Sequence, residues 1–114
     1  MKIPFRLPSL NEYIAACNHN RHKGAEFKKK WENDIAYFIK GHYGGAVFIA
    51  FTWYEPNRRR DRDNIASAKK FILDAMQKKG VLRNDKQVIG FTDRFVYGQG
   101  EGVEIEILEV KKDG

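Results

Sequence analysis

The chain has 114 residues, of which 42% are hydrophobic and 13% aromatic. This is enough for one domain with a core and too apolar for wholesale disorder. No apolar run approaches the roughly 18–20 residues of a membrane span, and Met1–Phe5 resembles no secretory signal, so no membrane association is expected. One cysteine, Cys17, excludes an internal disulfide framework and a multi-cysteine zinc site, and we expect a reduced, cytoplasmic setting.

Basic residues outnumber acidic residues by 21 to 15, which gives a net charge of +6. The excess is uneven, because residues 1–40 and residues 41–80 each carry eight basic and four acidic side chains. Residues 81–114 carry five basic and seven acidic side chains. A basic N-terminal part and an acidic C-terminal part favour one surface that binds a polyanion. The alternative explanation is that the net charge serves solubility alone.

The first elements in chain order are a short strand, a loop and a helix. Residues 2–7 read as the strand, and the turn-forming composition of residues 18–24 predicts a loop. Residues 25–40 are predicted to form a helix because apolar residues recur at spacings of four, four and three. The residues of this stripe are Phe27, Trp31, Ile35 and Phe38.

The central elements are a strand followed by a second helix. Residues 46–54 are almost all apolar, β-branched or aromatic, which predicts a central strand covered on both faces. Apolar residues then repeat at helical spacing over residues 64–79. Asp63 is an acceptable N-cap for this helix, and Gly80 is a suitable C-terminal cap.

Two further strands are predicted at residues 87–97 and 103–110, joined by the glycine-rich turn 98–102. Adjacent strands with such a turn suggest a hairpin. The order β-α-β-α-β-β therefore predicts a single mixed α/β (α+β) domain over residues 1–114, with two main helices covering a small mixed sheet. Residues 111–114 are expected to be a frayed tail.

Three aspartates are candidates for chemistry. Asp61 and Asp63 lie two residues apart among four arginines, and Asp85 follows the second helix. Mg²⁺ prefers carboxylate oxygens together with water and substrate phosphate, and nearby basic residues can hold neighbouring phosphates. The predicted helix carries the chain about 24 Å away at ~1.5 Å per residue, and the return segment spans about 20 Å at most. The reach from Asp85 to Asp63 is therefore tight, and a site shared between two subunits stays open.

The same residues have an ordinary structural interpretation. Asp63 would only cap a helix, and Asp61 would only balance the arginines around it. The pair alone is therefore weak evidence for a metal site, because two aspartates at this spacing are common.

A longer series of motifs is more specific. Arg60–Asn64 is followed by a lysine on the helix, and then by Asp74–Met76, Gly80–Leu82 and Asn84–Asp85. This series resembles the RusA family of Holliday junction resolvases. Leu7–Asn11 is similar to that family's opening P-S-x-N pattern, and Val88–Phe91 to phage and prophage members. The resemblance covers residues 3–108.

The resemblance implies a crossover junction endodeoxyribonuclease, a phosphodiester hydrolase of DNA recombination and repair. Such an enzyme is a homodimer that depends on Mg²⁺, for which Mn²⁺ substitutes, and uses no small-molecule cofactor. It makes paired symmetric nicks in a four-way DNA junction and leaves 5′-phosphate and 3′-hydroxyl ends. Asp61, Asp63 and Asp85 match the family's three metal-binding, catalytic aspartates.

The family's catalytic lysine lies four residues before the aspartate of the D-A-[LM] motif, which selects Lys70. The spacing from Asp63 to Asp74 is longer than in the best-known form of the family by about one helical turn, and counting forward from Asp63 gives Ser67 instead. Lys70 is preferred because it lies seven residues after Asp63 on the same helix face. Lys69 is the alternative, and it is also a candidate DNA contact. The remaining predicted DNA-binding residues are Lys28, Lys29, Lys30, Arg58, Arg59 and Arg60.

Two other functions remain open. One is a non-catalytic basic module that binds nucleic acid, and the other is an RNA-directed nuclease that uses the same carboxylates. The three carboxylates favour a nuclease, because they repel phosphate unless a metal ion lies between them. His19, His22 and His42 are expected to be exposed rather than metal ligands.

Overall fold

The computed structural model describes residues 1–110, and it confirms a single α+β domain with a four-stranded mixed sheet. The expected tail at residues 111–114 lies outside the described residues. The elements are β1 (Lys2–Ile3), α1 (Leu10–His19), α2 (Arg21–Ala36), β2 (Val47–Glu55), α3 (Arg62–Ala66), α4 (Lys69–Lys79), the 3₁₀ helix η1 (Asp85–Gln87), β3 (Val88–Tyr97) and β4 (Gly102–Glu109).

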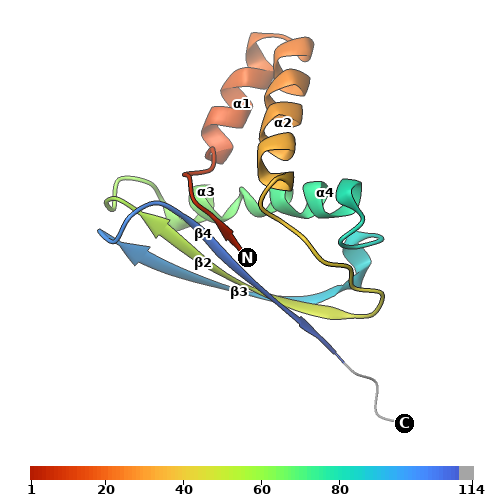
Figure 1. Ribbon diagram of the computed structural model, residues 1–114. Coiled ribbons are helices and arrows are strands. Elements are labelled where there is room, and N and C mark those ends of the chain that lie inside the picture. Colours follow the sequence, from red (N-terminus) through yellow and green to blue (C-terminus); the bar gives the residue numbers. More distant parts are fainter. Residues whose placement is uncertain (111–114) are drawn as a thin grey trace.

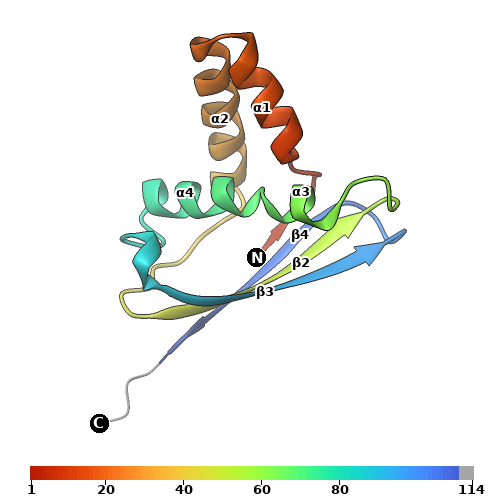
Figure 2. The same cartoon turned by 180° about the vertical axis from the view of Figure 1, so that it is seen from behind.

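Strand β2 lies inside the sheet, as predicted, but it is covered on one face only. Its residues alternate between buried and half-buried along the whole strand. Figures 1 and 2 show all of the described helices on the same side of the sheet, with α3 and α4 lying directly over it. The expectation of cover on both faces was wrong because the half-buried positions are also apolar or aromatic, as Phe48 and Tyr54 show. A nearly continuous apolar run therefore concealed the alternation.

The predicted hairpin between the last two strands is also wrong, because β2 lies between them. The sheet order is β1-β4-β2-β3, with β3 parallel and β4 antiparallel to β2. The parallel pair is joined through α3 and α4, as a crossover connection requires. The chain then crosses to the far side of β2, where Ile105 and Val103 lie opposite the buried Phe51 and Trp53.

Gly102 allows the close approach of β4 to β1. Its φ of 121° favours glycine, and an added Cβ would lie 2.3 Å from the carbonyl oxygen of Ile3. Strand β1 is shorter than the predicted 2–7, because Pro4 follows Ile3 and has no backbone N–H for the ladder. Met1 nevertheless extends the contact, since its amino group donates to the carbonyl oxygen of Ile105 at 2.8 Å.

Residues 18–24 are not the predicted loop, because α1 and α2 are separated by Asn20 alone. Asn20 has an extended backbone, and its side chain caps α2 by accepting from the Lys23 N–H at 2.8 Å. Gly24 is buried within α2, where an added Cβ would lie 2.8 Å from the Cys17 sulfur. Gly24, which contributed to the predicted turn, therefore allows α1 and α2 to pack closely. The two helices form a hairpin that projects from the sheet (Figure 1).

The helices bury the predicted apolar positions. Ile35 is fully buried, and Phe27, Trp31 and Phe38 pack against the core, although α2 ends at Ala36. Gly80 ends α4 in the left-handed conformation with a φ of 83°, as predicted. Among the helices of residues 1–110, none has the length and apolar character needed to cross a membrane.

Candidate active site

The carboxylates of Asp61 and Asp63 stand at the start of α3, immediately after the arginine-rich loop. Asp61 occupies the N-cap position, but its side chain accepts no capping hydrogen bond. Its backbone carbonyl starts the helix instead, accepting from the Ile65 N–H at 3.1 Å. Both aspartates are exposed, and within residues 1–110 neither forms an ion pair. Helix capping and pairing with arginine therefore do not account for these carboxylates.

The predicted single helix over residues 64–79 is broken at Ser67 and Ala68. The Ser67 hydroxyl donates to the carbonyl oxygen of Asn64 at 2.7 Å, and the Ala68 N–H bonds to Ile65 three residues back. Both contacts span three residues, as in a 3₁₀ turn, and they end α3. A new helix then starts at Lys69. The helix-face argument that connected Asp63 to Lys70 was therefore wrong, because one straight helix does not carry both residues.

A cavity of about 440 Å³ nevertheless brings Lys70 close to Asp85. Asp85 reaches it because Val81 and Leu82 are buried just after α4 and fix the return of the chain. Asn84 then caps η1, accepting from the Lys86 N–H at 2.8 Å, and leaves the Asp85 carboxylate exposed. The residues that line the cavity are Ala66, Ser67, Lys69, Lys70, Leu73, Asp74, Asp85 and Phe91.

The two candidate lysines at the start of α4 have different surroundings. The Lys69 ammonium donates to Asp93 at 2.7 Å and lies 4.6 Å from the centre of the Phe91 ring. The other Asp93 oxygen accepts from the Trp53 indole at 2.9 Å, so Lys69 is tied to the sheet. Lys70 is exposed and forms no ion pair within the described part of the chain. These surroundings favour Lys70 as the lysine available to a ligand in the cavity.

The arginine loop divides into exposed and buried side chains. Arg58 and Arg59 are exposed, and Arg58 lies over the Tyr97 ring at 4.4 Å. Arg60 instead pairs with the buried Glu55 at 3.4 Å and donates to the carbonyl oxygen of Leu7 at 3.2 Å. Burial lowers the pKa of the Arg60 guanidinium, and the adjacent Glu55 carboxylate opposes that shift. Arg60 therefore stabilises the packing of the loop, and this role is separate from its predicted contact with DNA.

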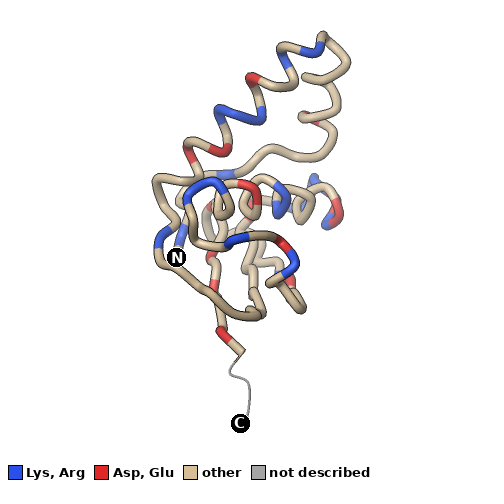
Figure 3. Tube along the Cα trace, turned by 90° about the vertical axis from the view of Figure 1, so that its right-hand side faces the viewer, with Lys and Arg blue, Asp and Glu red and all other residues tan. Residues whose placement is uncertain are grey.

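The three consecutive lysines of α2, at positions 28–30, are also unlike one another. Lys28 pairs with Asp74 at 3.0 Å, and Asp74 belongs to the wall of the cavity. Lys30 pairs with Asp34 at 3.4 Å, whereas Lys29 is exposed and unpaired within residues 1–110. Figure 3 shows these basic positions as one stretch midway along the projecting hairpin. Lys28 is thus an internal bridge between α2 and α4 as well as a candidate DNA contact.

The donors fit Mg²⁺ by type, but residues 1–110 contain no group of three or more acidic, histidine or cysteine side chains that could hold a metal ion. Asp61 and Asp63 do not line the cavity that contains Asp85. Mg²⁺ is commonly held by one or two carboxylates, with water and substrate phosphate completing the shell. These exposed carboxylates, which form no ion pair within residues 1–110, are therefore compatible with this ion without forming a complete cage.

The sequence analysis assigns no role to Asp74, which lines the cavity, or to Asp93, which binds the cavity residue Lys69. Asp74 was recognised as part of a motif, but its pairing with Lys28 depends on the contact between α2 and α4. Asp93 gave no signal, because its pairing with Lys69 depends on how α4 lies on β3. Neither contact is local in sequence.

A basic loop, exposed carboxylates and an exposed lysine beside a cavity are features of a protein that acts on phosphodiesters. The sequence matches the family described as Endodeoxyribonuclease RusA over residues 6–108. The chain therefore belongs to the RusA family of endodeoxyribonucleases, the Holliday junction resolvases. No match was found among curated proteins.

Proposed function

We propose that this protein is a Mg²⁺-dependent endonuclease that resolves four-way DNA junctions by paired symmetric nicks. Family membership supports the endodeoxyribonuclease class and the branched DNA substrate. The observation that carries the catalytic assignment is the cavity shared by Lys70 and Asp85, two residues fifteen positions apart.

Asp61, Asp63 and Asp85 are the proposed ligands of Mg²⁺, and Mn²⁺ is expected to substitute. Their carboxylates are exposed and engaged in no ion pair within residues 1–110, so binding a cation breaks no existing contact of that kind. The bound ion would supply charge stabilisation at the phosphodiester and activation of water. It would also offset the repulsion between the carboxylates and the DNA phosphate.

Lys70 is the proposed catalytic lysine. Its ammonium would neutralise the charge that develops on the scissile phosphate, an effect that requires a donor placed in advance beside the reacting group. Position favours Lys70 over Lys69, because the ammonium of Lys69 is already bound to Asp93.

Exposed basic residues would hold the phosphates around the cut. Within residues 1–110, Arg58, Arg59 and Lys29 form no ion pair and are available for this role. The other predicted DNA contacts would first have to leave or share acidic partners; they are Lys28, Lys30, Arg60 and Lys69. A homodimer is proposed because a junction with approximate two-fold symmetry matches a protein with two equivalent sites.

The test is cleavage of a labelled four-way junction by wild type and by Asp63→Asn, in Mg²⁺ and in EDTA. We expect paired symmetric nicks that disappear in EDTA and in the variant while junction binding persists. Glu106→Gln, the same carboxylate-to-amide change at an exposed site on β4, is the matched control and should cleave normally.

Two outcomes would replace this proposal. Tight junction binding without any cleavage in Mg²⁺ or Mn²⁺ would indicate the non-catalytic nucleic-acid-binding module. Preferential cleavage of an RNA substrate of the same shape would indicate the RNA-directed nuclease.

A further inference from the structure

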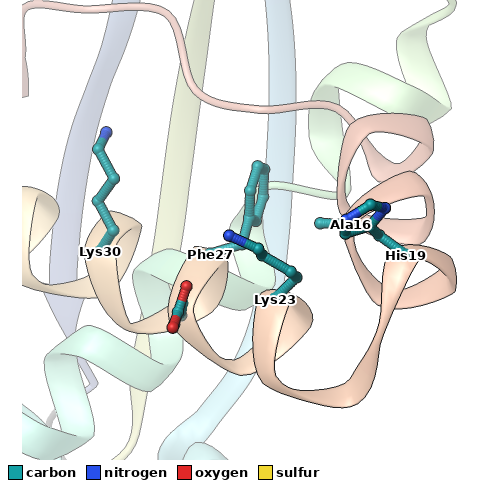
Figure 4. Close-up of a pocket in the computed structure, with 6 residues that line it drawn as sticks. Ala16, His19, Lys23, Phe27 and Lys30 are labelled. Carbon is teal, nitrogen blue, oxygen red and sulfur yellow. The ribbon is translucent and has the colours of Figure 1, made fainter.

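A second hollow lies between α1 and α2, on the projecting hairpin and apart from the residues of the proposed active site. Its volume is about 350 Å³. Figure 4 shows Ala16 and His19 on α1 facing Lys23 and Phe27 on α2. The residues that line the hollow are Ala16, His19, Lys23, Glu26, Phe27 and Lys30.

The charge around this hollow is mainly basic. Lys23 and Lys30 are exposed, and the pair that Lys30 forms with Asp34 is itself exposed and therefore weak. The tip of the hairpin, residues 18–25, contains Arg21 and Lys23 but no acidic residue. In Figure 3, the charged segments at the tip are all basic. Glu26 is the one carboxylate that lines the hollow.

The lining combines two kinds of surface. Ala16 and Phe27 are apolar, whereas the ammonium groups of Lys23 and Lys30 and the His19 ring provide N–H donors. Deoxyribose carbons can pack on the apolar part while the neighbouring phosphate meets the donors. This combination fits a nucleic-acid backbone better than an isolated inorganic anion.

Position separates this surface from the cut site. Lys28, on another side of α2, contacts Asp74 in the wall of the Lys70 cavity, while Lys23 and Lys30 line the hollow. Helix α2 has 16 residues and so spans about 24 Å. The hairpin therefore extends from its contact with α4, where Asp74 lines the cavity, to a tip that projects away from the sheet (Figure 1).

We propose that the hollow between α1 and α2 binds the sugar–phosphate backbone of a junction arm, away from the strand exchange point. This inference rests on the proposed function, because it assumes that the substrate is branched DNA. Lys23 and Lys30 contact phosphate, and Glu26 opposes it.

The test compares the double variant Lys23→Ala/Lys30→Ala with Lys2→Ala/Lys40→Ala, which removes the same charge from exposed sites outside the hairpin helices. Junction affinity is measured over a range of salt concentrations, with arms of about one and about two helical turns. For the hollow variant on long arms, we expect binding on the order of tenfold weaker and a salt slope lower by about one to two. We expect a smaller loss on short arms.

Glu26→Gln supplies a test of opposite sign. Removal of the repelling carboxylate should tighten binding to the long-armed junction two- to threefold, to roughly the extent of one weak surface charge contact. Equal losses in the two double variants, equal losses on both arm lengths, or no gain from Glu26→Gln would each overturn the proposal. A wild-type protein that neither binds nor cuts junctions would instead contradict the proposed function itself.

Discussion

Lys69 and Lys70 show how tertiary contacts distinguish two identical neighbours. Lys69 is bound to Asp93, which also holds the Trp53 indole, so three elements meet at one carboxylate. Lys70 has no acidic partner within the described residues and lines the cavity with Asp85. A lysine that already has a partner must lose that contact before it binds phosphate, whereas a free lysine does not.

We predict that Lys70→Met lowers the rate of junction cleavage by about 10²–10³, the usual loss when one preorganised donor is removed. Its melting temperature should match wild type, because no ion pair of the described chain is broken. Lys69→Met should instead lower stability by about 1 kcal/mol through loss of the Asp93 contact. Single-turnover cleavage and thermal unfolding measure the two effects. A large loss of cleavage in Lys69→Met but not in Lys70→Met would select Lys69 as the catalytic lysine.

At the scale of elements, charged side chains join the helical hairpin to α4. Lys28 of α2 lies between Asp74 and Glu32, with its ammonium 3.0 Å and 3.6 Å from their oxygens. Glu32 is buried and also accepts from Lys78 of α4. The hairpin is therefore connected to the wall of the active-site cavity by ion pairs as well as by aromatic packing, such as that of Tyr13 against Phe71 at 5.3 Å.

This connection should depend on pH. The hydrogen bond that the Lys28 ammonium donates to the Asp74 carboxylate is the largest cause that raises the pKa of Lys28 above its ordinary 10.5. A raised pKa in the folded state adds stability that is present below pH 10.5 and is lost as the pH rises through the folded-state pKa. The side chain is 34% exposed, so solvent screening keeps the effect below about 1 kcal/mol.

We predict that Asp74→Asn is less stable than wild type near pH 8 and that the difference narrows above pH 10.5. Thermal unfolding followed by circular dichroism from pH 8 to pH 11 measures this. Asp34→Asn, which removes an exposed partner of Lys30 on the same helix, is the control and should show a smaller difference. A constant gap between Asp74→Asn and wild type across this range would contradict the role of Lys28.

At the scale of the whole molecule, one chain presents one proposed active site, and a four-way junction offers two symmetric strands to cut. The proposed homodimer supplies the second site. We predict that light scattering coupled to size exclusion gives twice the mass of one chain at micromolar concentration. A chain that stays monomeric on junction DNA yet makes paired nicks would show that the two cuts need no dimer.

The family, the apolar stripes of the helices and the glycine that ends α4 could all be predicted from the amino-acid sequence. They could be predicted because they depend on local motifs, on helical spacing and on a φ that glycine adopts readily. The candidate aspartates were also recognisable, because the motif around Asp61 and Asp63 is contiguous. Their roles in holding metal and cutting DNA remain predictions.

Features that depend on contacts between residues distant in sequence became visible only in the folded structure. The tertiary structure placed β2 between the last two strands, so their turn closes no hairpin. It broke the second helix at Ser67, where a side-chain hydrogen bond competes with helix continuation. It paired Lys69 and Lys28 with carboxylates distant in sequence. It also placed Lys70 beside Asp85 in the cavity, with no ion pair to any residue of the range 1–110. Local spacing cannot predict these outcomes, because packing between elements determines which side chains meet.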